Sequence, residues 1–220
     1  MSGLTSSPKV LKGGLVVLAP GGGAVQRTIS LQYNPDTLTR SYQVQGVGGE
    51  GGGERAQPFR LKGPAIETIK LEAEIDATDQ LEFPENNANA VQFGVGPQLA
   101  VLEMLVHPSV DELLNTASMS ANGTLEVIPP EAPLVLFIWS KNRVVPVRVT
   151  EFSITEEAFD PNLNPIRAKV SLGLRVMSTD DLGFQHKGGT IFMSYLRTRE
   201  ALANKAAGAT LQSLGITSLP

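Results

Sequence analysis

The chain has 220 residues, of which 41% are hydrophobic and 18% charged, and its formal net charge is −4. A chain of this length can bury a core unaided, and the lack of cysteine excludes disulfides, thiolate nucleophiles and the commonest zinc ligands. The acidic balance argues against a nucleic-acid binder, because no basic excess is present to neutralise phosphates. The opening stretch MSGLTSSPKVLKGG has no apolar segment, so we expect no secretory signal. No apolar run approaches the roughly 20 residues of a membrane helix, so we expect no membrane insertion.

In the first third of the chain, apolar and polar residues alternate with the period of half-buried strands. The pattern predicts short strands at Leu15–Leu18, Thr28–Tyr33 and Leu38–Val44, and a long strand at Ile66–Asp76. In the second of these strands, the residues predicted to face inward are Ile29, Leu31 and Tyr33. The outward face of the long strand carries the charged residues Lys70, Glu72, Glu74 and Asp76.

Two stretches are predicted to be loops, Gly46–Pro58 and Phe83–Asn89. In the first, Gly46, Gly48 and Gly51 match the spacing of a dinucleotide-binding fingerprint. That motif needs a helix directly after it, and here more glycines and a proline follow, so no nucleotide site is expected. A long glycine-rich loop has little apolar surface to hold it on its own domain. We therefore expect this loop to be flexible in the free protein and to dock on a neighbouring subunit ring.

Helical patterns are fewer and shorter than the strand patterns. Apolar residues recur at helical spacing at Leu99, Leu102, Leu105 and Val106. Pro108 is predicted to end that helix, and Ser109 to cap the next one. Asp111 and Glu112 follow in the first turn of this second helix, where the helix dipole favours negative charge.

The strand pattern returns in the second half of the chain. A continuous apolar run predicts a strand at Leu134–Trp139, followed by a turn at Lys141–Asn142 and a strand at Val144–Thr155. The apolar phase of this last strand changes midway, which predicts a β-bulge near Thr150–Glu151. Pro146 lacks an N–H donor, so we expect its end of the strand to lie at an edge or a bend.

The clearest alternation of all predicts a strand at Ile166–Val176. Its outward face carries the polar residues Arg167, Lys169, Ser171 and Arg175. A helix is predicted at Thr190–Ala207, and a weakly structured tail after Gly208. The apolar side of this helix is predicted to hold Phe192, Tyr195, Leu196 and Leu202. The helix can pack on its own domain or grip a partner, and the sequence leaves both alternatives open.

Reactive side chains are sparse. The chain has two histidines, His107 and His186, and both are interpreted as structural or surface residues. No G-x-S-x-G elbow or P-loop is present, and the paired carboxylates Glu156–Glu157 and Asp180–Asp181 are interpreted as solvated. The sequence therefore predicts no enzyme, no cofactor and no metal site.

The predicted fold class is α+β and mainly β, with short helices in the middle of the chain and a helix near its C-terminus. Two units are predicted along the sequence. Residues 1–187 would form a β domain that contains the flexible loop at about residues 45–60. Residues 188–220 would form the C-terminal helix and the tail.

Three stretches together resemble the tube proteins of contractile injection systems and their baseplate-adaptor, or tube-initiator, relatives. The first is a strand that ends in Tyr33-Asn34-Pro35, where Asn34 and Pro35 are expected to form a tight turn. The second is Lys62-Gly63-Pro64 before the long strand at Ile66–Asp76. The third runs from Leu136-Phe137-Ile138-Trp139 through Phe152–Phe159 to Asn164-Pro165-Ile166-Arg167-Ala168. The resemblance spans roughly residues 14 to 178.

The resemblance implies a phage-tail-tube-like β-sandwich or barrel that assembles into a hexameric ring. The ring would join the inner tube to the spike, or hub, of the baseplate, with inner-tube, spike and baseplate proteins as partners. Assembly is expected in the cytoplasm, with release as part of the particle left open. Nothing after Ala203 resembles the LysM module that many family members carry. Two alternatives remain: the major inner-tube subunit, and a stand-alone β-sandwich that binds a ligand.

The residues expected to take part in assembly lie in the Asn-Pro turn, the glycine-rich loop and the two charged strand faces. They are Tyr33, Asn34, Pro35, Gly46, Gly48, Gly51, Glu72, Glu74, Arg167, Lys169 and Arg175. The acidic face, with Asp76, and the basic face are expected to meet, within one subunit or between two.

Overall fold

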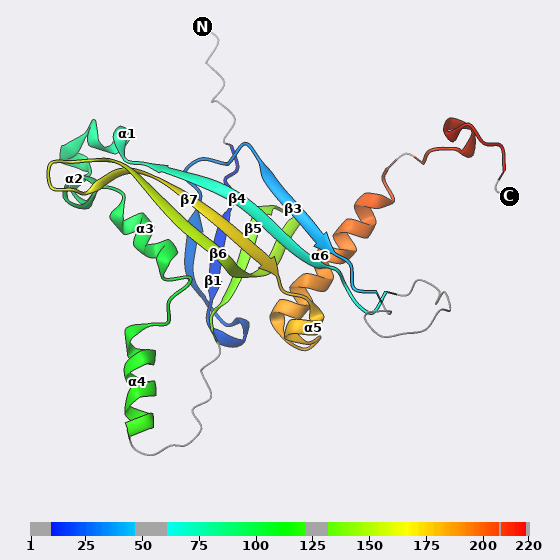
Figure 1. Ribbon diagram of the computed structural model, residues 1–220, viewed down its shortest axis with the longest axis horizontal. Helices are drawn as coiled ribbons and strands as arrows, with labels where there is room; N and C mark the ends of the chain where they lie inside the picture. The colour runs from blue at the N-terminus through cyan, green and yellow to red at the C-terminus, as the bar shows by residue number, and fades with distance from the viewer. Residues whose placement is uncertain (1–9, 47–60, 122–131, 207, 219–220) are drawn as a thin grey trace, which may run out of the picture.

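The protein is described by a computed structural model that covers residues 10–46, 61–121, 132–206 and 208–218 (Figure 1). Within these residues the centre is a seven-stranded antiparallel sheet with the strand order β2-β1-β5-β6-β7-β4-β3. The strands are β1 (Gly14–Leu18), β2 (Val25–Ser30), β3 (Leu38–Gln43), β4 (Ile66–Asp76), β5 (Leu134–Ser140), β6 (Arg143–Phe159) and β7 (Pro165–Val176). The prediction of a mainly β fold with short helices is confirmed.

Helices gather at both ends of the long strands β4, β6 and β7 (Figure 1). They are α1 (Thr78–Leu81), α2 (Ala88–Phe93), α3 (Gly96–Glu103), α4 (Val110–Ala121), α5 (Thr179–Leu182) and α6 (Lys187–Ala203). Three 3-10 turns lie at Pro20–Gly22, Pro84–Asn86 and Leu211–Leu214. The stretch predicted as the loop Phe83–Asn89 therefore contains a 3-10 turn and the start of α2, because Pro84 at its first position favours helical backbone angles.

Strand β6 links the two halves of the sheet. Its first part pairs with β5, and its longer second part pairs with β7 up to the pair Phe159–Pro165. The register shifts between Val149 and Glu151, which confirms the predicted bulge. The strand runs past its predicted end at Thr155, because pairing with β7 holds a hairpin arm whose residues are half or fully exposed.

The core lies on the face of the sheet that the alternation pattern assigned to it. Ile69, Phe137, Val145, Val170 and Leu174 are almost completely buried there. At one end of the sheet, Leu99 and Leu102 of α3 join this cluster, and at the other end Phe192 and Tyr195 of α6 do so. A smaller cluster on the opposite face of β5 combines Leu134 and Leu136 with Leu182 and Ile191.

Two residues predicted to face inward do not. Tyr33 lies beyond the end of β2 and is 47% exposed, because the strand ends at Ser30 and the alternation ends with it. Leu202 is 46% exposed, because the last turn of α6 extends past Phe192, Tyr195 and Leu196, the residues of the helix that pack in the core.

Helix α6 starts earlier than predicted. His186 precedes it as the N-cap, and its Nδ1 accepts a hydrogen bond of 3.0 Å from the Gly188 amide. The two glycines that follow are buried, and a Cβ on Gly189 would lie 2.0 Å from the carbonyl oxygen of Gly183. The glycines are therefore sites of close packing inside the helix, whereas the predicted helix began only after them, at Thr190.

Pro146 was expected at an edge or a bend, but β6 is an interior strand of the sheet. The Pro146 carbonyl accepts a hydrogen bond from the amide of Met177, the residue directly after β7. Because the amide and carbonyl of one residue face the same neighbour in an antiparallel ladder, the missing N–H of Pro146 points to where β7 has just ended. β6 therefore borders an edge at Pro146, although the strand as a whole is an interior one.

We expect Phe192→Ala in α6 to lower the free energy of unfolding by about 3–5 kcal/mol, because the ring is buried in the main core. Leu202→Ala in the same helix is the matched control, and we expect a change within about 0.5 kcal/mol. Urea unfolding followed by circular dichroism measures both. Equal losses for the two variants would contradict the packing of α6 described above.

Candidate assembly surfaces

The predicted meeting of acidic and basic rows occurs within one chain. In the register of β4 and β7, Glu74 lies opposite Lys169 and Asp76 opposite Arg167. Arg167 Nε lies 2.8 Å from Asp76 Oδ2 and 3.9 Å from Glu74 Oε1. Lys169 turns to β6 instead, where its Nζ lies 3.1 Å from Glu157 Oε1. These opposite charges align the strands of one subunit, and their part in assembly stays a prediction.

Asp76 is the junction of this charged surface. Burial by itself would raise the pKa of the Asp76 carboxyl, but hydrogen bonds from Thr78 and Arg167 outweigh it and hold the pKa below its usual range. Thr78 donates both its amide and its hydroxyl, and Arg167 adds an ion pair. The end of β4 is therefore fixed by a carboxylate that stays ionised at neutral pH.

Two of the predicted charged residues lie outside the meeting rows. Glu72 lies opposite Ser171 and makes no ion pair within the described part of the chain. Arg175 lies opposite Thr68 and Arg148 and turns to Asp181, with 2.8 Å between Nη2 and Oδ1. Within the subunit Arg175 therefore does not meet the acidic row, because it pairs with Asp181 in α5.

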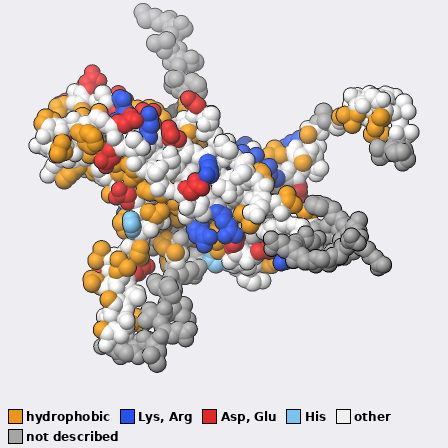
Figure 2. All heavy atoms as spheres, viewed as in Figure 1, with side chains coloured by type: hydrophobic (Ala, Val, Ile, Leu, Met, Phe, Trp, Pro, Cys, Tyr) orange, Lys and Arg blue, Asp and Glu red, His pale blue; other side chains and the backbone are white. Residues whose placement is uncertain are grey.

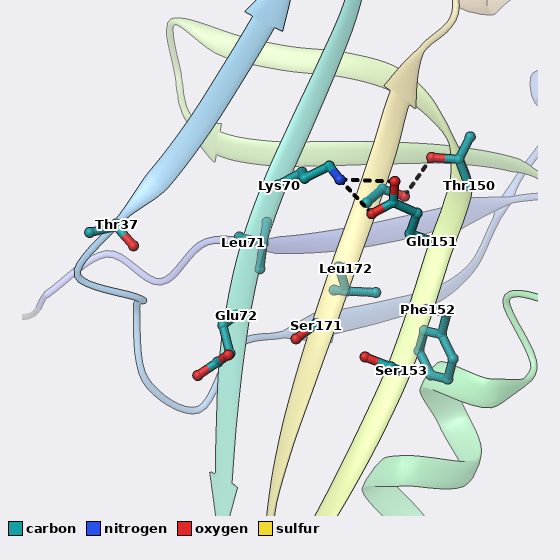
Figure 3. A pocket seen from close by; sticks show the side chains of 11 residues that line it. Thr37, Lys70, Leu71, Glu72, Thr150, Glu151, Phe152, Ser153, Ser171 and Leu172 are labelled. Carbon is teal, nitrogen blue, oxygen red and sulfur yellow. Dashed lines mark hydrogen bonds and ion pairs between the residues drawn. The ribbon is translucent and has the colours of Figure 1, made fainter.

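A hollow opens on the outer face of the sheet where the bulge lies (Figure 3). Lys70 on β4 and Glu151 on β6 both lie opposite Gly173 on the strand between them. The two side chains meet above β7, with 2.6 Å between Lys70 Nζ and Glu151 Oε2 (Figure 3). A Cβ on Gly173 would lie 2.8 Å from Glu151 Cβ, so only glycine leaves room for this contact. The hollow is open and lined by an already paired lysine and glutamate.

The Asn-Pro stretch acts differently from the prediction. Residues 31–37 have bends but no hydrogen-bonded turn at Asn34 and Pro35. Instead, the Asn34 side chain accepts from the Gly13 amide at 2.9 Å and donates to the Leu11 carbonyl at 2.8 Å. The expected tight turn is therefore wrong, because the Asn34 side chain holds the segment before β1 rather than closing a turn of its own.

The glycine-rich loop is described only at its ends. Gly46 pairs with Leu61 in an isolated antiparallel bridge, and the Lys62 amide donates to the Gln45 carbonyl at 2.9 Å. Gly48 and Gly51 lie outside the described residues. The flexibility and docking of this loop stay predictions.

The one buried carboxylate among the described residues was missed by the sequence reasoning. Glu67 is 4% exposed, and it lies on the core face of β4 because it shares the phase of Ile69. Its Oε1 accepts from the Tyr42 hydroxyl at 2.8 Å, and its Oε2 from the Tyr195 hydroxyl at 3.0 Å. The alternation pattern could have found it, since position 67 belongs to the inward row of the strand.

Two arginines complete the Glu67 cluster. Arg40 Nη1 lies 3.3 Å from Glu67 Oε1, and Arg199 donates to the Tyr195 hydroxyl at 2.7 Å. The cluster joins the edge strand β3, strand β4 and helix α6, where Arg199 lies three residues from both Leu196 and Leu202 of the predicted apolar side. Burial raises the pKa of the Tyr42 phenol, and its hydrogen bond to Glu67 raises it further. The cluster can therefore hold helix α6 on the sheet through side-chain hydrogen bonds.

Other chemical sites are not evident in the described ranges. Within them, no group of three or more His, Asp or Glu side chains could hold a metal ion. His107 is exposed after α3, and His186 caps α6. None of the helices described is long and apolar enough to cross a membrane.

The raised pKa of Tyr42 predicts a loss of stability at high pH. Above about pH 10, the ordinary tyrosine pKa, the unfolded chain releases the Tyr42 proton while the folded chain keeps it. The unfolded state then binds fewer protons, so the free energy of unfolding falls as the pH rises. We expect Tyr42→Phe to flatten this fall in urea unfolding between about pH 8 and pH 11. A variant that loses stability as steeply as the natural protein would contradict the assignment.

Comparison with known proteins gives matches among solved structures and one family. Nine chains of solved structures match. One belongs to the tail of an empty GTA particle, computed with helical refinement and C6 symmetry, with 14% identity over 74% of this chain and 90% of that chain. Its TM-score is 0.27, which is too low to establish a shared fold. No curated protein matches the chain.

The family model matches residues 20–184, which is more than half of the chain. This span begins at the first 3-10 turn, contains strands β2 to β7, and ends just after α5. The model is described as contractile injection system tube protein. The resemblance noted from the sequence is confirmed, and the chain belongs to the contractile injection system tube protein family.

Proposed function

We propose that this protein is a structural, non-enzymatic subunit that assembles with copies of itself into a hexameric ring between the inner tube and the spike, or hub, of the baseplate. The observation that carries this proposal is the uncovered apolar surface of α4 in a chain of the tube family. The partners would be inner-tube, spike and baseplate proteins, and no cofactor takes part.

Helix α4 stands apart from the sheet (Figure 1). Its start is well formed, since the Ser109 amide donates to Glu112 Oε2 at 2.8 Å and the Glu112 amide to Ser109 Oγ at 3.2 Å, the predicted cap. None of its described residues is buried, and Leu113 and Leu114 are 55% and 62% exposed. An isolated helix of this length is marginal in water, so its apolar side needs a partner surface.

The exposed apolar side chains are not scattered evenly over the molecule. In Figure 2 they gather over α4 and over the end of the sheet that carries α1 and α2. At that end Phe83, Val91 and Phe93 are exposed. Contiguous apolar surface of this kind is typical of proteins that assemble.

The sheet also leaves two edge strands, β2 and β3. Edge strands present unpaired amide and carbonyl groups that can add a strand from another chain. Copies related by a rotation would therefore have a means of extending the sheet around a ring. Continuity of the sheet between subunits is part of the proposal.

The position at the end of the tube is supported by what lies beyond the matched family region. Helix α6 begins at Lys187, directly after that region, and the tail that follows is exposed along residues 208–218. Such an addition suits a single ring with a second partner better than a repeating unit. The second candidate is the major inner-tube subunit, which the description of the family favours.

Counting copies separates the two candidates. Quantitative mass spectrometry of purified particles should give one ring of copies per particle for the end-of-tube position. A copy number that grows with particle length would support the inner-tube subunit instead. Absence from purified particles would contradict both.

We expect the double substitution Leu113→Asp and Leu114→Asp to leave the thermal melting of the isolated protein almost unchanged, because both side chains are exposed. Particles should then lack the protein or fail to form, since two charges would have to enter an apolar contact. Asn115→Asp on the same helix is the matched control and should assemble normally. Electron microscopy of particles made with each variant measures the outcome, and normal particles from the double variant would contradict the role of α4.

A further inference from the structure

A groove lies between strands β2 and β4, which are not paired with each other in the sheet. One end of β2 and the chain after it, Thr28–Gln32, lie across a groove of about 310 Å³ from Ala73, Glu74 and Ile75 of β4. Pro97, Gln98, Val101 and Leu102 of α3 form the remaining wall. Strand β3 does not fill this gap, because it begins at Leu38, which pairs with Leu71, and it does not reach residues 73–75 of β4.

The backbone of β4 presents hydrogen-bonding groups to the groove. The Ala77 amide donates to β7, so the amide and carbonyl of Asp76 face the other way. Residues alternate along a ladder, so the amide and carbonyl of Glu74 also face away from β7. No backbone hydrogen bond outside the strand ladders uses these two groups of Glu74 among the described residues.

The backbone of β2, on the opposite wall, also presents hydrogen-bonding groups to the groove. The Leu31 amide donates to the Gly13 carbonyl on the β1 side, so the amides and carbonyls of Ser30 and Thr28 face away from β1. Both residues line the groove. Two strand edges with free backbone groups therefore face each other across apolar side chains.

A side chain already occupies one end of the groove in the manner of a strand. Gln32 Nε2 donates to the Asp76 carbonyl at 2.7 Å, and Gln32 Oε1 accepts from the Asp76 amide at 3.0 Å. This pair of bonds copies what a residue of an added strand would make. The site therefore accepts an amide group with both a donor and an acceptor.

We infer that this groove, between β2 and β4, binds an extended segment of a second copy of the chain as an added strand, and that the segment is Val10–Lys12. The inference rests on the proposed self-assembly for its occupant, but the groove itself can be tested without assembly.

The chemistry of Val10–Lys12 fits the groove. The segment has no helix or strand, and Val10 and Leu11 are 78% and 81% exposed, so their own domain does not cover them. Lys12 makes no ion pair within the described chain, Glu74 lines the groove, and Glu72 lies two residues before it on the same exposed face of β4. An apolar side chain can enter the groove while the lysine meets these carboxylates. Among the described residues, the exposed apolar side chains of α4 and of Leu211–Leu214 belong to helical segments, which cannot add as strands.

The test uses a labelled peptide with the sequence of residues 8–14, PKVLKGG, and the full-length protein carrying Val10→Ser and Leu11→Ser. The two substitutions prevent the same segment of other protein copies from competing with the peptide. Fluorescence anisotropy should show saturable binding, and the peptide PKSSKGG should not bind. Binding that does not saturate by about 1 mM would overturn the inference, since it would leave less than about 4 kcal/mol of affinity.

Two receptor variants locate the binding. Glu74→Pro removes the amide that faces the groove and leaves the bonds to β7 in place, whereas Glu74→Gln keeps the amide and removes only the charge. Val101→Trp fills the groove from α3. We expect Glu74→Pro and Val101→Trp each to weaken binding at least about tenfold, and Glu74→Gln to weaken it less. Thermal melting shows which variants are folded, and unchanged binding to a folded Glu74→Pro or Val101→Trp protein would overturn the inference.

A failure of the peptide to bind would leave the ring proposal standing, because that proposal is tested by copy number and by α4. Conversely, peptide binding in a protein that never enters particles would support the groove and contradict the proposed function.

Discussion

The bulge at Thr150 is the constraint on which the rest of the sheet depends. Strand β6 is long enough to pair with β5 at one end and with β7 at the other, so it passes through both halves of the core. Without an extra residue, the side chains after the bulge would point to the face opposite Val145 and Val147. The bulge puts Phe152 and Ile154 on the same face as those valines, and one continuous core results.

The long strands could be predicted from the sequence because their signal is local and repeated. Eleven residues of alternation define β4, and the observed bounds, Ile66–Asp76, equal the predicted ones. The cap of α4 was equally predictable, since Ser109 and Glu112 are three residues apart and need nothing else to meet. Where a pattern is complete within a few neighbouring residues, the sequence is sufficient.

The misses that involve polar side chains share one feature, which is that the sequence pattern did not identify the partner of the side chain. Glu67 is stable in the core because Tyr195, 128 residues away, donates to it. The side chain of Asn34 binds backbone groups of residues 11 and 13 instead of closing a turn. Arg175 pairs with Asp181 because the chain turns back directly after β7. In each case a local pattern can place the polar group, but its partner depends on how the chain folds.

The Glu67 cluster also provides a mechanical link between helix α6 and the edge strand β3. Arg199 donates to the Tyr195 hydroxyl one turn before it on α6, and Tyr195 shares the Glu67 carboxylate with Tyr42 of the edge strand β3. A pull on the C-terminal segment is therefore passed to this outer strand through side-chain hydrogen bonds. Because Glu67 belongs to β4, the same contacts join α6 to both strands of the β3–β4 ladder.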